Sequence, residues 1–483
     1  MIARMAACIG TLSLLASGSG GELSGQCADQ VEPGTRPVRY EMALRIDYQQ
    51  EKLAGQVRLT LENHSTQPVT RVPLLLYRLM AIESILDGDR TNLRFEQKVV
   101  GFQDWPQLQV NFVEVTLARP LKPDEQRTLE IDYSGYLLGY AETGMRYVQD
   151  RIDADFTIIR PDAFSYPEVG VPCIGAMRRM GLSSFDYQVS VTVPDSLRVV
   201  NGGELVELKR NDGLLTYTYR STTPAWRMDF AVADYGVLEA GTNRVFFLPG
   251  DSAGAVQVLE ALEGALTLFE EWFGPLARPQ GHSVIEIPDG WGSQKDETTI
   301  IQAAAAFRDP GQAREVYHEV SHFWNVPSLD QPAPRWNEGL ASFLEYRALE
   351  EIENRRVVEQ RFTSVRDWLV DALERRPELG NVPLSEYGEQ QLTDYSYSVG
   401  MLFFALLHEL VGQETFNRII GGFYQEYQAV GATTDQFADY VRAVATPGQG
   451  KLIEDWLYTT GWTAVIAEDS TLMGVASRYR GGR

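Results

Sequence analysis

Two histidines in the second half of the chain have the spacing of a metal site. Residues 318–322 read His-Glu-Val-Ser-His, inside a helical pattern that begins after residue 311. On an α-helix, residues i and i+4 share a face, so the imidazoles of His318 and His322 can reach one cation. Glu319 lies one step around the helix, where it can touch a water on the metal without ligating the metal. With only five histidines in the chain, composition gives about 0.007 chance occurrences of this pattern, so we predict a zinc site rather than two incidental surface histidines.

A zinc ion held by two imidazoles needs a third protein ligand. Catalytic sites of this kind use two histidines and one glutamate and keep a further position for water. Residues 336–341 read Trp-Asn-Glu-Gly-Leu-Ala, with Glu338 at the start of the next helical pattern. Position and residue type therefore predict Glu338 as the third ligand of one zinc ion per chain. Glu345 lies two turns later on the same face and could orient a ligating imidazole, but a plain surface carboxylate explains it equally well.

The secondary structure that must position these residues is predicted to change from strands to helices near residue 250. In the first half, apolar and polar residues alternate with the period of a β-strand, as in 57–62, 113–117 and 187–193. Beyond it, apolar residues recur at three- and four-residue spacing, which is typical of helices. We predict helices over the ranges 256–273, 312–325, 338–376, 398–411, 414–427 and 434–444. Short apolar segments predict strands at 284–287 and 299–307, the second an edge strand that could pair with an extended peptide.

These patterns predict a multidomain α+β protein in which an antiparallel β domain precedes a mainly helical catalytic domain. We expect the following ranges: a signal peptide at 1–20, the β domain at 21–245, the catalytic domain at 246–465 and a C-terminal tail at 466–483.

The N-terminus has the composition of an export signal. Arg4 precedes a mostly apolar stretch, 5–16, which is followed by the small residues 17–20. We expect an exported protein, periplasmic, extracellular or associated with the envelope, and a disordered cytosolic N-terminus is the alternative. Cys27 leaves lipoprotein anchoring open, although residues 24–26 match the lipidation box poorly. The apolar stretch at 5–16 is shorter than the ~20 apolar residues that a bilayer-spanning helix needs, and no longer apolar run occurs elsewhere.

Cysteine usage and charge narrow the class further. Removing the signal would leave Cys27 and Cys173, which could form a disulfide in an oxidising compartment or remain two unrelated thiols. The chain has 43 Lys and Arg against 66 Asp and Glu, a net charge of −23. Because a surface this acidic repels phosphate backbones, we expect no nucleic-acid partner. The oligomeric state does not follow from the sequence.

Several segments together resemble a known family. The stretches HEVSHFWN and WNEGLASFLEY are similar to the gluzincin aminopeptidases, the group that contains aminopeptidase N and the leukotriene hydrolases. Further similarity lies in residues 39–44, 55–57, 187–195, 223–226 and 394–400. The resemblance covers about 35–465, without the large helical C-terminal domain that many members carry. It implies a saddle-shaped β domain, a thermolysin-like catalytic domain and, from the family's Tyr-x-x-Gly segment, a catalytic tyrosine at Tyr397.

The chain departs from the family pattern at two places. The family usually has about eighteen residues between the second histidine and the glutamate, whereas fifteen separate His322 from Glu338. Shortening a surface loop need not move either helix, so we expect the site to be intact. The family's Gly-x-Met-Glu-Asn segment, whose glutamate binds the substrate's α-amine, corresponds to 290–297 here. Asp296 or Glu297 could substitute for that glutamate, but Lys295 would oppose a cationic amine.

The resemblance implies a zinc metallopeptidase that hydrolyses peptide substrates. Glu319 would take a proton from the zinc-activated water as general base and return it to the leaving amine as general acid. The phenol of Tyr397 would stabilise the developing oxyanion, with Tyr395 as the alternative tyrosine. Aminopeptidase-like action is the first expectation. The alternatives are an endopeptidase, a zinc hydrolase of a different substrate, and a catalytically silent scaffold with the same fold.

Overall fold

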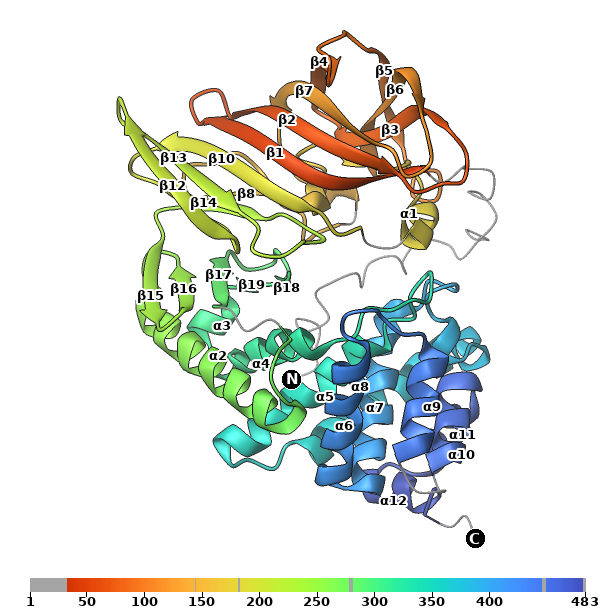
Figure 1. Ribbon diagram of the computed structural model, residues 1–483. Coiled ribbons are helices and arrows are strands. Elements are labelled where there is room, and N and C mark those ends of the chain that lie inside the picture. The colour runs from red at the N-terminus through yellow and green to blue at the C-terminus, as the bar shows by residue number, and fades with distance from the viewer. Residues whose placement is uncertain (1–32, 144, 181–182, 278–280, 445–448, 481–483) are drawn as a thin grey trace. The chain divides into compact units, whose positions relative to one another are not determined.

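The computed structural model describes residues 33–143, 145–180, 183–277, 281–444 and 449–480 (Figure 1). The predicted signal peptide, Cys8 and Cys27 lie outside these residues. The chain forms two compact units: a β unit, Met1–Ala255 with Gly281–Ala304, and a helical unit, Val256–Gln280 with Ala305–Arg483. A β-rich part followed by a helical part confirms the predicted α+β class. The units are interleaved in sequence, because 256–280 belongs to the helical unit and 281–304 returns to the β unit.

The described residues of the β unit form four sheets. The seven-stranded sheet has the order β12 (Glu204–Asn211), β13 (Leu214–Arg220), β10 (Asp186–Pro194), β1 (Thr35–Asp47), β2 (Lys52–Asn63), β7 (Gln126–Tyr136), β4 (Met80–Asp87). The four-stranded sheet has the order β5 (Arg94–Gly101), β6 (Gln109–Leu121), β3 (Val69–Tyr77), β9 (Glu168–Val169). The three-stranded sheet is β11 (Arg198–Val200), β14 (Phe230–Ala233), β8 (Thr157–Ile159). The five-stranded sheet is β15 (Gly236–Ala240), β16 (Asn243–Phe247), β17 (Ser283–Ile287), β19 (Thr299–Ala303), β18 (Gln294–Lys295).

Alternation of residue types explains the strands of the large sheet. In β2, Val57, Leu59 and Leu61 are at most 1% exposed, while the residues between them are exposed or half-buried. One face of the strand therefore joins the core and the other meets solvent. The predicted antiparallel pairing holds for β1 with β2 and for β2 with β7, but β1 and β10 pair in parallel. This difference arises because alternation fixes which face is buried and not which distant strand becomes the neighbour.

The strand predicted at 299–307 is shorter than expected and is not an edge. β19 ends at Ala303, and Ala305–Arg308 forms the short helix α3. β19 lies between β17 on one side and β18 on the other, where Gln294 and Lys295 pair with Ile301 and Ile300. The prediction of an open edge at β19 is therefore wrong along its paired residues, because a two-residue strand is too short to leave a signal in the sequence.

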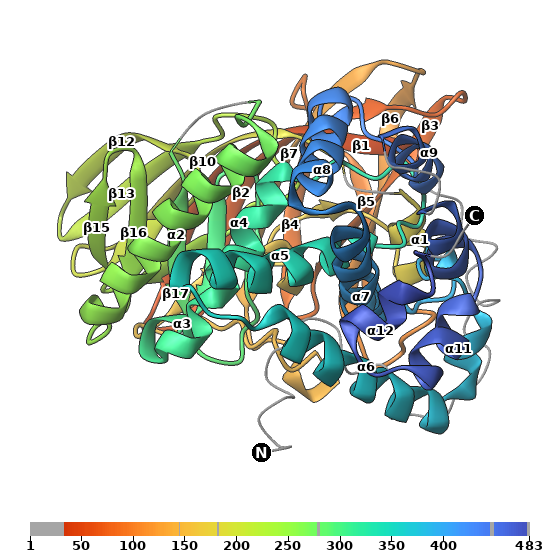
Figure 2. The same ribbon diagram turned by 90° about the horizontal axis from the view of Figure 1, so that it is seen from below.

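The longer elements of the helical unit are α2 (Ser252–Phe273), α4 (Arg314–Ser321), α5 (Trp336–Glu353), α6 (Val358–Arg375), α7 (Thr393–Val411), α8 (Gln413–Tyr427) and α9 (Thr434–Val444). Short helices follow at α10 (Gln449–Ile453), α11 (Gly461–Glu468) and α12 (Leu472–Ser477). α7 contacts α5, α6, α8, α10 and α12. Figure 2 shows it among α5, α6, α8 and α12. Its central place explains why eleven of its residues are buried and why its sequence is nearly apolar from Val399 to Leu407.

Two predictions about the helices need correction. The single pattern at 338–376 is two helices, because Asn354 takes a left-handed conformation (φ 52°) that ends α5. The predicted tail at 466–483 is folded as far as it is described. Leu472 and Val475 of α12 are buried, and Tyr479 is 3% exposed, with its hydroxyl accepting from Trp456 Nε1 at 3.0 Å. The apolar spacing within α12 is too short to be distinguished from chance in the sequence.

Cys173 of the β unit is disulfide-bonded. The alternative in which Cys173 is a free buried thiol is therefore wrong. The other two cysteines of the chain, Cys8 and Cys27, lie outside the described residues. Among the helices that the structure describes, none combines the length and the apolar character needed to cross a membrane.

α5 and α7 cross with their backbones in close approach. A Cβ added to Gly339 would lie 2.3 Å from the Cα of Gly400 and 2.7 Å from the carbonyl oxygen of Ser396. No side chain larger than hydrogen fits at this crossing, because the nearest atoms belong to backbone and cannot turn aside. The crossing sets the distance between the residues beside it, Glu338 on α5 and Tyr397 on α7.

We expect Gly339→Ala to separate these two helices and to lower the free energy of unfolding by about 1–3 kcal/mol or more, the usual cost of overpacking a core. The measurement is chemical unfolding followed by circular dichroism. Gly264→Ala in α2 is the matched control, since its Cβ meets only Ile352 Cδ1 at 3.7 Å. That control should be neutral or stabilising by up to about 1 kcal/mol. Equal behaviour of the two variants would contradict the close crossing.

Candidate metal centre

The two histidines of the motif are presented by one short helix and its end. His318 is in α4, and His322 begins a 3₁₀ turn, His322–Trp324. His322 keeps helical backbone angles (φ −65°, ψ −14°), so the i, i+4 relation holds across the change of helix type. The two rings lie with centroids 4.9 Å apart at an interplanar angle of 84°. Both imidazoles therefore face the same space.

Glu338 brings a carboxylate into that space from the first turn of α5. Its Oε2 lies 3.5 Å from His318 Nε2 and 3.3 Å from His322 Nε2, and the three ligand atoms lie within 4.8 Å of one another. A tetrahedral zinc ion with bonds of about 2.0–2.1 Å puts neighbouring donors about 3.3 Å apart. The donor set and the spacing therefore fit one zinc ion held by two histidines and one glutamate.

Outer contacts hold both imidazoles from behind. His318 Nδ1 lies 3.6 Å from Glu345 Oε2, and Arg314 Nε lies 3.0 Å from the other oxygen of Glu345. The Asn325 amide nitrogen lies 2.7 Å from His322 Nδ1. A metal on Nε2 of His318 leaves its proton on Nδ1, which faces the Glu345 carboxylate. Asn325 was not assigned this position from the sequence, although it closes the HEVSHFWN stretch.

The carboxylates around the two histidines favour a positive charge between them. Burial lowers the pKa of His318, but the hydrogen bonds that its imidazole donates to Glu338 and Glu345 and the charge of Glu319 outweigh burial and raise the pKa to about 10. Burial raises the pKa of Glu338, but Arg335, His322 and His318 outweigh it and hold the pKa well below its usual range. The carboxylates that favour a charged imidazole at His318 also favour a divalent cation at this place.

Tyr397 lies beside the histidine cluster and Tyr395 does not. The Tyr397 ring is parallel to that of His318, with centroids 6.1 Å apart and an interplanar angle of 8°. Tyr395 instead stacks on Trp368, with centroids 5.8 Å apart, and its hydroxyl lies 3.3 Å from Arg376 Nη1. Of the two tyrosines considered from the sequence, only Tyr397 has its ring against a predicted metal ligand.

Sequence reasoning missed a cation in this cluster. Arg335 directly precedes α5 with a left-handed backbone (φ 59°, ψ 31°), which turns its side chain back over the helix start. Its Nη2 donates to Glu338 Oε1 and lies 3.5 Å from the Tyr397 hydroxyl oxygen. No signal in the sequence marks this position, since arginine is common at exposed loop ends and a left-handed arginine is unusual.

The shortened loop between His322 and Glu338 is tied to α9. The Asp330 carboxylate accepts from the backbone N–H of Thr434 at 2.8 Å and from its hydroxyl at 2.6 Å. Trp336 Nε1 donates to the same hydroxyl at 3.0 Å. These bonds hold the loop at both ends of its second half. The loop therefore brings Glu338 to the two histidines despite its reduced length.

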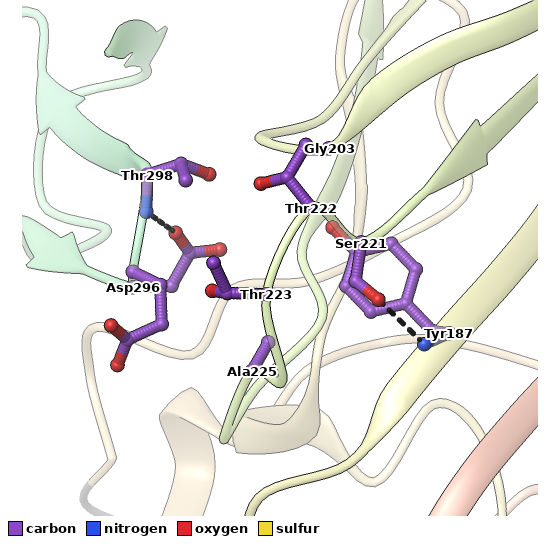
Figure 3. Close-up of a pocket in the computed structure, with 9 residues that line it drawn as sticks. Tyr187, Gly203, Ser221, Thr222, Thr223, Ala225, Asp296 and Thr298 are labelled. Carbon is purple, nitrogen blue, oxygen red and sulfur yellow. Dashed lines mark hydrogen bonds between the residues drawn. The ribbon is translucent and has the colours of Figure 1, made fainter. Parts of the chain in front are cut away.

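The two predicted amine-binding residues belong to the β unit. Asp296 follows β18, and its Oδ1 accepts from the backbone N–H groups of Thr298 and Thr299, both at 2.8 Å. It lines a small pocket with Tyr187 and the hydroxyl residues of the loop 221–223, and Figure 3 shows its carboxylate directed toward Thr298 at the pocket wall. Asp296 is 4% exposed, whereas Glu297 is exposed. Their roles in substrate binding stay a prediction.

We expect Asp296→Asn to stabilise the protein at neutral pH. Burial, assisted by Asp229, raises the pKa of Asp296 to about 6 against donation by the two backbone N–H groups. Because this pKa exceeds that of the unfolded chain, the folded state binds more protons between pH ~4 and ~6, and stability falls as pH rises through this window. The substitution should raise the free energy of unfolding at pH 7 by up to about 3 kcal/mol and have no effect below pH ~4. Glu297→Gln is the exposed control, and equal pH profiles for both variants would contradict this account.

Comparisons with known proteins agree with the site. Residues 300–456 match the Peptidase family M1 domain. The chain is 19% identical over 308 residues to Probable aminopeptidase 1 of Saccharolobus solfataricus, covering 58% of this chain and 39% of that protein. It is 25% identical over 309 residues to Aminopeptidase M1-A of Oryza sativa subsp. japonica, covering 58% and 34%. The chain thus spans less than half the length of these relatives.

Solved structures agree on the fold. An M1 zinc metallopeptidase from Deinococcus radiodurans superposes with a TM-score of 0.63 at 18% identity, covering 90% of this chain and 96% of that chain. A mutant of that enzyme has been solved bound to a Tyr-Ser-Ala substrate. At this identity the match concerns the arrangement of a β-rich part and a helical part. The chain is thus similar to the Peptidase family M1 domain over residues 300–456 and to an M1 zinc metallopeptidase in its fold.

Proposed function

We propose that this chain, which matches the Peptidase family M1 domain over residues 300–456, is a zinc-dependent metallopeptidase with aminopeptidase-like action on peptides. The observation that carries the proposal is the convergence of His318, His322 and Glu338 on one point, with ligand atoms within 4.8 Å of one another. Glu319 and Tyr397 next to this cluster supply the two further groups that hydrolysis needs. A scaffold without activity has no use for all five.

Each residue has a separate part in the reaction. Bound zinc supplies a Lewis acid that polarises a carbonyl and lowers the pKa of a water to about 7. His318, His322 and Glu338 would hold this zinc ion. Glu319 takes the proton of the attacking water and delivers it to the leaving amine. The hydroxyl of Tyr397 donates to the oxygen on which negative charge develops.

Aminopeptidase action is supported by the relatives' names and not by the amine-binding segment. Both curated relatives are aminopeptidases, and a mutant of the Deinococcus enzyme binds a tripeptide. In this chain Lys295 precedes Asp296, and a lysine there disfavours a cationic amine. This observation keeps endopeptidase action, or hydrolysis of a different substrate on the same metal, as the second candidate.

We also propose export to an oxidising compartment. The disulfide at Cys173 supports it, since disulfides persist in such compartments and are rare in the cytosol. The apolar stretch at 5–16 agrees with it. Peptides would then be met outside the cytoplasm, with no nucleic-acid partner for a chain of net charge −23.

The proposal is tested by zinc content together with cleavage of one peptide, presented with a free and with an acetylated N-terminus. We expect one zinc per chain and cleavage of the free form only. Glu319→Gln should retain the zinc and lose turnover by about a hundredfold or more, because it removes the base and leaves the ligands. Cleavage of both forms would replace aminopeptidase with endopeptidase action. Full activity of Glu319→Gln, or no zinc after metal reconstitution, would contradict the proposal.

We expect Tyr397→Phe to lower kcat by about 10²–10³-fold with little change in KM, the usual cost of removing a donor to a developing oxyanion. Tyr395→Phe is the matched control two residues away, with its hydroxyl on Arg376, and should leave kcat within about twofold. Steady-state kinetics on one peptide decide between them. Equal losses would mean that the tyrosine is assigned wrongly.

A further inference from the structure

The two oxygens of Glu338 have different partners. Oε2 faces the imidazoles, at 3.5 Å from His318 Nε2 and 3.3 Å from His322 Nε2. Oε1 accepts from Arg335 Nη2. A carboxylate that offers one oxygen to a metal has its second oxygen free to approach the metal too, unless a donor holds it. Arg335 is placed to be that donor.

The same nitrogen of Arg335 also reaches Tyr397. Arg335 Nη2 lies 3.5 Å from the Tyr397 hydroxyl oxygen, and the guanidinium carbon lies 5.9 Å from the centre of the Tyr397 ring. A guanidinium only donates hydrogen bonds. In this contact Arg335 is therefore the donor and the Tyr397 oxygen is the acceptor. Donation from a cation makes the O–H of Tyr397 a stronger donor.

We propose that Arg335 is a positioning residue that limits Glu338 to one oxygen toward the metal and, by donating to the Tyr397 oxygen, strengthens the Tyr397 hydroxyl as a donor. This inference rests on the proposed function, because it assigns how two members of that site are held. The left-handed backbone of Arg335 supports it, since a strained arginine persists only where its surroundings require it. The Arg335 side chain is 34% exposed and that of Glu338 is 9% exposed. The carboxylate end of this ion pair is therefore buried, and the arginine end is partly exposed to solvent.

The test uses Arg335→Met in the full chain, alone and combined with Tyr397→Phe. We expect Arg335→Met to keep one zinc per chain and to lower kcat by about 10–100-fold with KM changed less than about threefold. In the Tyr397→Phe background the same substitution should cost less than about threefold, because the hydroxyl it acts through is gone. Equal losses in both backgrounds would overturn the action on Tyr397.

The action on Glu338 has a readout that needs no turnover. Cobalt in place of zinc reports its coordination number through its visible absorption, which falls when a fifth ligand atom binds. Arg335→Met frees Glu338 Oε1 and should lower this absorption, and an unchanged spectrum would overturn this part. If the parent chain binds cobalt and cleaves no peptide, the proposed function fails while this result still stands.

Two further variants serve as controls. Arg376→Met removes an arginine that also contacts a tyrosine hydroxyl, that of Tyr395 at 3.3 Å, and a carboxylate, that of Glu378 at 2.8 Å. It should leave kcat and the cobalt spectrum unchanged. Arg335→Lys keeps a charged donor, so its kcat should stay within about tenfold of the parent. This variant also keeps the test possible if Arg335→Met does not fold. A lysine variant as impaired as the methionine variant would overturn the proposal.

Discussion

The close crossing of α5 and α7 at Gly339 and Gly400 is the constraint on which the metal centre depends. Backbone meets backbone there, so the distance between the helices is set by hard contact rather than by adaptable side chains. Glu338 is next to one glycine and Tyr397 is one turn before the other, so the ligand and the phenol are fixed relative to each other. α4, which presents His318, packs on the same α5. A site that requires positions within about half an ångström gains this accuracy when it is built on helices and not on loops.

Compensation of charge explains how these carboxylates can lie together in a buried place, although burying a charge costs free energy. Carboxylates removed from water are costly unless cations compensate them, and Glu338 and Glu345 are each about a tenth exposed. Arg335 and Arg314 supply part of this compensation. Each contacts a carboxylate oxygen other than the one that faces an imidazole. A divalent metal beside the imidazoles would therefore leave both arginine contacts in place.

Helical period made the ligands predictable from the sequence, since i and i+4 share a face whatever the surrounding fold. Strand alternation likewise predicted the β-rich first half, because burial of one face follows from residue type. Features that depend on distant parts of the chain could not be predicted in this way. The parallel pairing of β1 with β10 is one, and the two-residue strand that covers β19 is another. Arg335 could not be predicted for a different reason. Its place follows from a left-handed backbone, and the sequence predicts such a backbone at glycine or asparagine rather than at arginine.

The choice between Asp296 and Glu297 as an amine ligand depends on where the desolvation cost falls. An exposed carboxylate such as Glu297 must lose its water when an ammonium binds, and this loss offsets most of the attraction. Asp296 is already buried, so the cost is included in the folded state and appears as the raised pKa. A carboxylate with a pKa of about 6 is still charged at pH 7, and a bound ammonium would return its pKa toward the usual value. Its Oδ1 is engaged by two backbone N–H groups that fix its orientation, as in a preorganised binding group. Of the two carboxylates, Asp296 therefore has less hydration to lose when an ammonium binds, and its role in substrate binding stays a prediction.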